Sequence, residues 1–303
     1  MKWQKGWQSW EPVPGISLDV FCARGSRDGK TVVITAGVHG DEYEGPAAVM
    51  ELARQLTKAN LFGTVVAIPV LNPPAFIAGT RTNPEDGLNL ARCFPGKVDG
   101  KPTERLAAAL FERLGTKTNY LIDLHSGGVE YVFLPLAGFY GPSEAGNPSY
   151  QSARCFGLPY LWQLPATPGV LSHEAHKRDA VAIGNEYLGA GKLSNAGVSA
   201  YCEGILRCLA CWGLSATEFP PASGQKVLIG DWQLAARSGL FTAHVKLGEE
   251  VRAGTHVGST LDMRGNVLEK FVAAHDGRVT ALRSKAYIRE GSWAVLVAES
   301  KNA

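Results

Sequence analysis

Short β-branched apolar runs alternate with amphipathic stretches from residue 31 to about residue 214. Runs of the first kind predict strands, and apolar positions spaced three and four residues apart predict helices. We expect strands at 31–36, 64–70, 119–124 and near 198–202, and helices near 43–56, 103–114, 148–156 and 204–212. Strands that alternate with helices favour a mixed or mostly parallel sheet covered by helices, which is an α/β fold.

The pattern changes after residues 217–224, where paired prolines and small residues cannot continue a helix. From Lys226 to the end, short apolar stretches are separated by turn glycines, which is typical of an all-β module. The sequence therefore predicts an α/β domain over residues 1–220 and a β-rich domain over residues 225–303.

Two motifs at the ends of predicted strands contain residue types that bind metal ions. His39 and Glu42 lie in T-A-G-V-H-G-D-E from Thr35, and His125 lies in D-L-H-S-G-G from Asp123. Two histidines and one carboxylate are a known ligand set for a catalytic zinc ion that keeps a fourth position for water. Open α/β sheets place ligands at the carboxyl ends of their strands, so the three side chains can meet there. The sequence thus predicts a metal centre for amide hydrolysis.

These motifs resemble those of the succinylglutamate desuccinylase/aspartoacylase family, a branch of the zinc carboxypeptidase superfamily. Similar stretches follow in family order at 35–45, 68–76, 79–81, 93–96, 103–107 and 120–128. The resemblance implies a zinc carboxypeptidase-like mixed sheet flanked by helices, one Zn²⁺ per catalytic domain, and hydrolysis of an amide bond. Residues 239–279 resemble the biotinyl/lipoyl-like sandwich that family members carry as a second domain. The expected hairpin at 262–266 lacks the modifiable lysine of a carrier domain, so we expect a structural role.

The resemblance also implies roles for Arg81 and Glu203. Arg81 matches the family arginine that polarises the scissile carbonyl, and Glu203 matches a strand-end glutamate that serves as general base and acid. Family members usually follow that glutamate with a run of glycines, whereas this chain continues with Gly204, Ile205 and Leu206.

Ala91 and Arg92 stand where the family usually has an Asn-Arg pair that binds the substrate carboxylate. Arg92 still offers a bidentate guanidinium group. Asn89, three residues earlier, could face the same way on a helical turn and partly replace the missing amide. Arg92 and Asn89 are therefore the candidate substrate-binding residues.

Two further polar groups have a less direct relation to the metal centre. Asp123 shares a strand face with His125 and could orient its imidazole. His173 and His176 are three residues apart, whereas the zincin helix needs histidines four apart, so we expect a polar loop there, or one lining the substrate pocket.

The composition mainly excludes some classes of partner and location. The chain has 303 residues, 45% of them hydrophobic, and a net charge of +2 with no basic block, so we expect no nucleic-acid or membrane partner. No apolar run is long enough to span a bilayer, and residues 1–7 lack the apolar core of a signal peptide. The six scattered cysteines fit reduced thiols, with Cys208 and Cys211 as small hydrophobic residues on a buried helix. We therefore expect a cytoplasmic protein.

The sequence as a whole predicts a zinc-dependent deacylase that acts on a small N-acylated amine or N-acyl amino acid, and such a site could also hydrolyse esters. One alternative is a zinc carboxypeptidase, which is disfavoured because Ala91 breaks the carboxylate-binding pair. Another is a metal- or small-molecule-binding homologue without turnover, suggested by the altered stretch after Glu203. The sequence leaves open the acyl group, the amine and the metal used in the cell. It also leaves open whether the chain forms a homo-oligomer.

Overall fold

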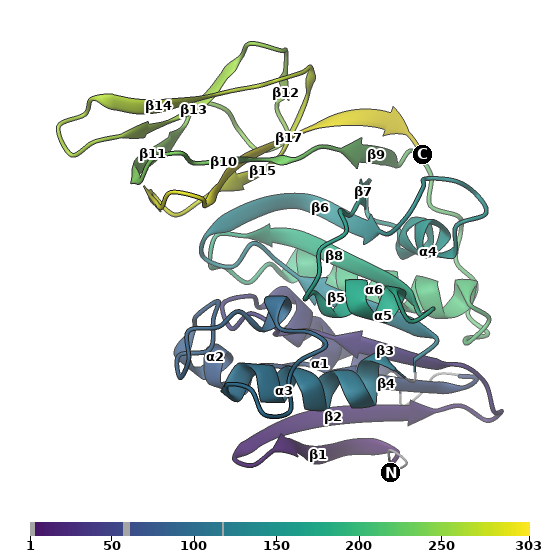
Figure 1. Cartoon of the computed structure of the whole chain (residues 1–303). Helices are drawn as coiled ribbons and strands as arrows, with labels where there is room; N and C mark the ends of the chain where they lie inside the picture. The colour runs from purple at the N-terminus through teal and green to yellow at the C-terminus, as the bar shows by residue number, and fades with distance from the viewer. Residues whose placement is uncertain (1–3, 57–60, 117) are drawn as a thin grey trace.

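A computed structural model describes residues 4–56, 61–116 and 118–303 (Figure 1). Residues 1–3, part of the segment expected to lack a signal peptide, lie outside the described residues, as do 57–60 and 117. The helices are α1 (Glu44–Leu56), α2 (Pro73–Ala78), α3 (Pro102–Leu110), α4 (Pro148–Phe156), α5 (Leu171–His176) and α6 (Asn195–Cys211), with short turns η1 (Leu90–Arg92) and η2 (Phe111–Gly115). The first strands are β1 (Gly6–Val13), β2 (Ile16–Arg24), β3 (Thr31–Thr35), β4 (Thr64–Ile68), β5 (Tyr120–His125), β6 (Tyr131–Phe139), β7 (Tyr160–Gln163) and β8 (Val181–Gly189). The later strands are β9 (Lys226–Ile229), β10 (Trp232–Leu234), β11 (Gly239–Ala243), β12 (Glu250–Val251), β13 (His256–Leu261), β14 (Val267–Val272), β15 (Gly277–Arg283), β16 (Tyr287–Ile288) and β17 (Trp293–Asn302).

The predicted mixed α/β sheet is confirmed. Its strand order is β1-β2-β4-β3-β5-β8-β6-β7-β9-β17-β15-β12, and β3 pairs in parallel with β4 and β5. The next strand, β8, is parallel to β5, which places the ends of β3, β5 and β8 at one edge. Val32, Val33 and Ile34 are buried because helices cover both faces of these strands.

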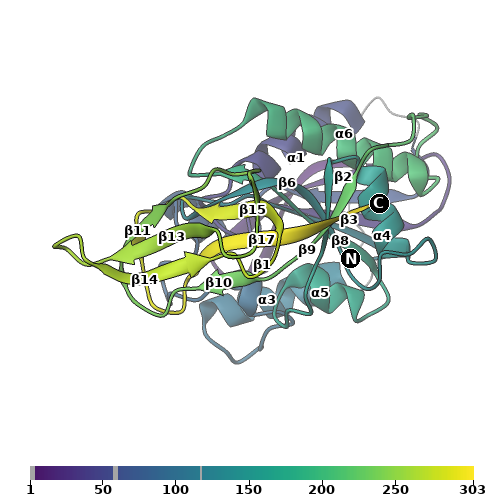
Figure 2. The same cartoon turned by 90° about the horizontal axis from the view of Figure 1, so that it is seen from above.

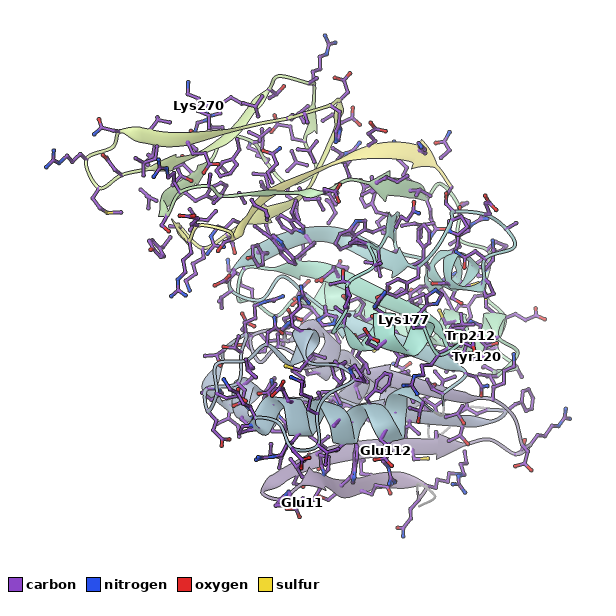
Figure 3. All side chains as sticks on the ribbon, viewed as in Figure 1. Glu11, Glu112, Tyr120, Lys177, Trp212 and Lys270 are labelled. Carbon is purple, nitrogen blue, oxygen red and sulfur yellow. A yellow bond between two sulfur atoms is a disulfide. The ribbon has the colours of Figure 1, made fainter. Side chains whose placement is uncertain are left out.

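Helices form a layer on each side of the sheet. Seen from above, α1 and α6 lie on one side and α3 and α5 on the other (Figure 2). Leu52 of α1 and Ile205 of α6 belong to one core, whereas Leu106 of α3 and Leu171 of α5 belong to the other. The stacked rings of Tyr120 and Trp212, 4.1 Å apart, attach the end of α6 to β5 (Figure 3). These two helix layers hold the central strands in place, and the predicted ligands lie at the carboxyl ends of those strands.

The predicted strand near 198–202 is wrong, because these residues lie inside α6. The Ser194 side chain caps this helix by accepting a hydrogen bond from the Gly197 amide. Tyr201, Ile205 and Leu209, spaced four residues apart, are fully buried on one helix face. Residues 181–189 form the fourth central strand instead.

The chain after residue 225 is rich in strands, and some of them extend the main sheet. β9 pairs in parallel with β7, and β15 pairs antiparallel with β6. The strands β14, β13, β11 and β16 form a separate four-stranded sheet that projects from the molecule (Figure 1). The turn at 262–266 joins β13 to β14, as expected. The biotinyl/lipoyl-like identity of this part and the division at residues 220 and 225 stay predictions.

Cys155 of α4 and Cys211 of α6 form a disulfide, so the prediction that all six cysteines are reduced is wrong. The two helices pack on the same face of the sheet, which brings the two Cα atoms to 6.4 Å although 56 residues separate them in sequence. Cys208 is a buried free thiol, as expected. The cytoplasmic location stays a prediction. Among the described residues, no helix has both the length and the apolarity needed to cross a membrane.

Candidate active site

The three predicted metal ligands lie together at the carboxyl edge of β3 and β5. The carboxylate of Glu42 lies between the two imidazoles, with Oε1 2.7 Å from His39 Nδ1 and Oε2 3.0 Å from His125 Nδ1. One candidate ligand atom from each residue lies within 4.8 Å of the others. His39 and Glu42 are almost fully buried. One ion could contact all three side chains.

Close packing of the loop after β3 explains its glycines. A Cβ atom on Gly40 would lie 2.0 Å from the backbone of Ala75, and the Gly40 amide donates to the carbonyl of Thr80. Gly37 has a φ of +59°, and a Cβ there would lie 2.8 Å from the Cα of Val70. The loop can therefore rest on the start of the α2 region and aim His39 and Glu42 inward.

Each histidine is also held through its second ring nitrogen. His125 Nε2 lies 3.2 Å from Asp123 Oδ2, and Asp123 Oδ1 accepts a 2.7 Å hydrogen bond from the Thr35 hydroxyl. His39 Nε2 lies 3.1 Å from Asn89 Oδ1. Such contacts fix the orientation of a ligand imidazole and the nitrogen it presents.

The position of Asn89 contradicts its predicted role in substrate binding. Its Oδ1 atom accepts a hydrogen bond from the Ala91 amide and faces His39, and its side chain does not line the cavity described below. Asn89 is the N-cap of η1, so it precedes the short turn that contains Arg92 and does not share a helix face with it. Asn89 is better placed to position His39.

Burial and neighbouring charges set the ionisation of the cluster. Burial and the Arg81 guanidinium lower the pKa of His39 to about 4, which keeps its imidazole neutral and able to bind a metal. Burial alone would raise the pKa of Glu42 and lower that of His125. The two imidazoles instead hold the pKa of Glu42 well below its usual range, and Asp123 and Glu42 hold the pKa of His125 well above its own.

These residues fit a divalent metal ion by the chemistry of their donors. Two imidazole nitrogens and a carboxylate oxygen suit zinc, and the buried carboxylates of Glu42 and Asp123 favour positive charge at this point.

Two arginines border the site, in keeping with the sequence. Arg81 Nη1 lies 3.0 Å from Glu42 Oε1, and both Arg81 and Arg92 line the adjacent cavity. Arg92 donates a 2.7 Å hydrogen bond to the Ala91 carbonyl, and its guanidinium carbon lies 6.0 Å from the centre of the Trp293 ring. Within the described part of the chain, no carboxylate forms an ion pair with Arg92.

Glu203 is not part of the site, so its assignment as general base is wrong. Its side chain is 57% exposed on α6 and forms an ion pair with Arg207, one helical turn later, at 2.8 Å. The assignment failed because it assumed a strand ending at residue 202, whereas a helix runs through this position.

Glu186 is the site carboxyl group that the sequence analysis missed. It lies on β8 directly beside His125 of β5 and lines the cavity. Burial, with the Glu42 carboxylate as the next contribution, raises the pKa of Glu186 well above its usual range. A signal was present, because the glycines expected after the base follow Glu186 at Gly189 and Gly191.

The predicted polar loop around His173 and His176 is a short, largely buried helix, α5. Glu174 stabilises it by accepting a hydrogen bond from the Gly169 amide and pairing with Lys177. Among the described residues, His39, Glu42 and His125 form the candidate metal-ligand group, and His173 and His176 do not belong to it. Ser172, from the same helix, lines the cavity.

A cavity of about 150 Å³ adjoins the metal-ligand group. His39 and His125 of the metal-ligand group line one part of the cavity, together with other polar side chains. Aromatic and aliphatic side chains line most of the remainder. The residues that line it are His39, Arg81, Ala91, Arg92, His125, Ser126, Phe133, Tyr140, Trp162, Leu164, Pro165, Thr167, Val170, Ser172, Gly184, Glu186, Trp232 and Trp293.

Solved structures resemble the whole fold. The succinylglutamate desuccinylase/aspartoacylase from Rhodobacter sphaeroides has a TM-score of 0.85 and 26% identity, covering 98% of this chain and 97% of that one. The product-bound ectoine utilization protein EutE (DoeB) from Ruegeria pomeroyi has a TM-score of 0.82 and 27% identity, covering 94% and 89% of the two chains.

Sequence comparison finds relatives of the same family. A curated relative, the N-alpha-acetyl-L-2,4-diaminobutyric acid deacetylase of Halomonas elongata, is 29% identical over 284 residues, which are 90% of this chain and 83% of the relative. The succinylglutamate desuccinylase/aspartoacylase catalytic domain matches residues 28–212, a stretch that includes the metal-ligand group, both arginines and Glu186. The chain therefore belongs to the succinylglutamate desuccinylase/aspartoacylase family of amide hydrolases.

Proposed function

We propose that the protein is a zinc-dependent deacylase that hydrolyses the amide of a small N-acylated amine or N-acyl amino acid. One observation carries this proposal: a single cavity is lined by His39, His125, Arg81 and the carboxyl group of Glu186. Amide hydrolysis needs a base for water and positive charge for the oxygen that becomes negative, and these side chains supply both.

In this reaction Glu186 replaces Glu203 as general base and acid. Its carboxylate takes a proton from the attacking water and later gives it to the leaving amine nitrogen. The raised pKa of Glu186, caused chiefly by burial, favours a carboxyl group that can hold this proton between the two steps. A carboxylate base with an ordinary pKa would hold it less well near neutral pH.

The remaining residues hold the substrate and stabilise charge. Zinc bound by His39, Glu42 and His125 would supply positive charge that polarises the carbonyl and lowers the pKa of water. Arg81 donates hydrogen bonds to the carbonyl oxygen as its charge grows. Arg92, which has no carboxylate partner among the described residues, binds a carboxylate of the substrate.

The relatives support acyl removal from an amino acid. The Halomonas elongata protein is named as a deacetylase of an N-acetylated diamino acid. To test the proposal, the zinc-loaded chain is incubated with a panel of N-acyl amino acids and N-acyl amines, and the released amine is measured. Turnover of at least one N-acyl substrate is expected. Cleavage of peptides alone would favour a carboxypeptidase, and zinc binding without any turnover would favour an inactive homologue.

A further inference from the structure

Four aromatic side chains form one wall of the cavity, which we call the aromatic wall: Phe133, Trp162, Trp232 and Trp293. The rings of Trp232 and Trp293 are stacked, with centroids 5.0 Å apart and planes 9° apart. The Phe133 ring packs edge-on against Trp232 at 5.7 Å and lies 6.3 Å from Trp162. The four rings therefore form a continuous apolar surface.

Half of this wall comes from strands that follow residues 217–224. Phe133 and Trp162 lie on β6 and β7, whereas Trp232 and Trp293 begin β10 and β17. β10 pairs with β17, and Tyr131 contacts both tryptophan rings, at 5.4 and 5.6 Å. The C-terminal part of the chain thus shapes the cavity next to the metal-ligand group.

The charges beside the wall disfavour a cationic occupant. Tryptophan rings often bind cations, but here Arg92 already lies over Trp293, and Arg81 also lines the cavity. Of the carboxylates in the described residues, Glu186 alone lines the cavity, and it lies beside His125 at the metal end. A second positive group on the wall would be repelled by two guanidinium groups. An uncharged group suits this surface better.

The size of the cavity limits that group. Its volume is about 150 Å³, and an apolar protein cavity of roughly this size binds one benzene molecule. Ala91, where the family usually has asparagine, leaves an apolar surface in place of an amide. The same cavity also has to hold the scissile amide, so the group on the wall is no larger than a single ring or a branched aliphatic group.

We propose that the aromatic wall selects N-acylated substrates that carry an uncharged, ring-sized apolar group, with Trp232 and Trp293 as specificity-determining residues that contact it. This inference rests on the proposed deacylase function. The apolar group could belong either to the acyl group or to the side chain of the amino acid. A single methylene in a matched apolar pocket is worth about ten- to two-hundredfold in kcat/KM, so a ring-sized group should gain at least about tenfold.

The test compares four substrates on the zinc-loaded full chain: N-acetylphenylalanine, N-benzoylglycine, N-acetylglycine and N-acetyl-2,4-diaminobutyrate. We expect at least one aromatic substrate to exceed N-acetylglycine about tenfold or more in kcat/KM. Preference for N-acetylphenylalanine assigns the wall to the side chain, and preference for N-benzoylglycine assigns it to the acyl group. Fastest turnover of the diaminobutyrate substrate would overturn the proposal.

Variants locate the preference on the wall. Trp232→Leu and Trp293→Leu should each lower kcat/KM for the preferred aromatic substrate severalfold more than kcat/KM for N-acetylglycine, mainly through KM. Trp7→Leu is the matched control, because Trp7 is 50% exposed on β1 and does not line the cavity. If a leucine variant does not fold, Trp232→Phe should retain the preference. An equal loss on all four substrates would contradict a specificity role.

Binding separates this inference from the proposed function. Calorimetry with the Glu186→Gln variant measures affinity for the same compounds without turnover. Tighter binding of an aromatic compound than of N-acetylglycine, which lacks the apolar group, supports the aromatic wall even if no substrate is hydrolysed by the wild type. Equal or weaker binding of both aromatic compounds would reject it even if deacylation is observed.

Discussion

Glu186 is the direct neighbour of His125 across the parallel strands β5 and β8. Side chains of paired residues in adjacent strands point to the same side of a sheet. Among the described residues, Glu186 is the one glutamate that lines the cavity, and this pairing brings it beside a predicted metal ligand, whereas Glu203 is exposed on α6.

The first prediction concerns this glutamate. Glu186→Gln should keep the metal and the fold but lose on the order of 10²–10⁴-fold in kcat, because the amide cannot accept the proton of water. Glu203→Gln is the matched control and should stay within about twofold of the wild type, as a surface substitution. Steady-state kinetics of both variants test whether Glu186 is the general base. Near-normal turnover by Glu186→Gln would remove it from the mechanism.

The second prediction concerns the support of His125. Asp123→Asn should weaken metal affinity by about 10- to 100-fold, since the carboxylate that orients the imidazole and raises its basicity is lost. The exposed Asp28 offers a control of the same chemistry in Asp28→Asn. Competition with a chelator of known affinity measures the change. Equal affinities in the two variants would show that Asp123 does not act on the ligand.

The third prediction separates the two arginines. Arg81→Ala should lower kcat by about 10²–10³-fold, because its charge stabilises an oxygen that becomes negative in the transition state. Arg92→Ala should mainly raise KM, by about tenfold or more, because a charged hydrogen bond to bound substrate is lost. Their kcat and KM values, measured on one N-acyl amino acid, test this division. The reverse pattern would exchange the two roles.

The fourth prediction concerns the link between α4 and α6. Cys155→Ser should lower the free energy of unfolding by about 2–4 kcal/mol, because the disulfide closes a long loop in the unfolded chain. Denaturant unfolding with and without reductant measures the difference. Reductant should destabilise the wild type to a similar degree and leave the variant unchanged. Mass spectrometry that finds six free thiols in the purified protein would contradict the pairing.

The grouping of His39, Glu42 and His125 could be predicted because the sequence signal is local. His39 and Glu42 are three residues apart in the loop after one apolar run, and His125 directly follows another. The regular alternation of elements before residue 157 likewise made the α/β sheet predictable.

Glu186, the proposed base, could not be predicted in the same way. The stretch from Val198 to Ile205 alternates apolar and polar residues closely enough to suggest a strand, and only packing of α6 against α1 and α4 selects the helix. Residues 181–189 contain Gly184 and Asn185 within the strand, which obscured its apolar pattern. The aromatic wall joins Phe133 to Trp232 through long-range strand pairing, for which the sequence carries no local signal.

We propose that amide hydrolysis depends on one zinc ion held by His39, Glu42 and His125. The most direct measurement is a titration of metal-free protein with zinc, in which release of amine from an N-acyl amino acid is followed at each step. We predict no activity without metal and a linear rise that ends at about one equivalent per chain, since the ligand set forms a single three-ligand site. Full activity of the metal-free protein, or one bound equivalent with no hydrolysis of any N-acyl substrate, would contradict the claim.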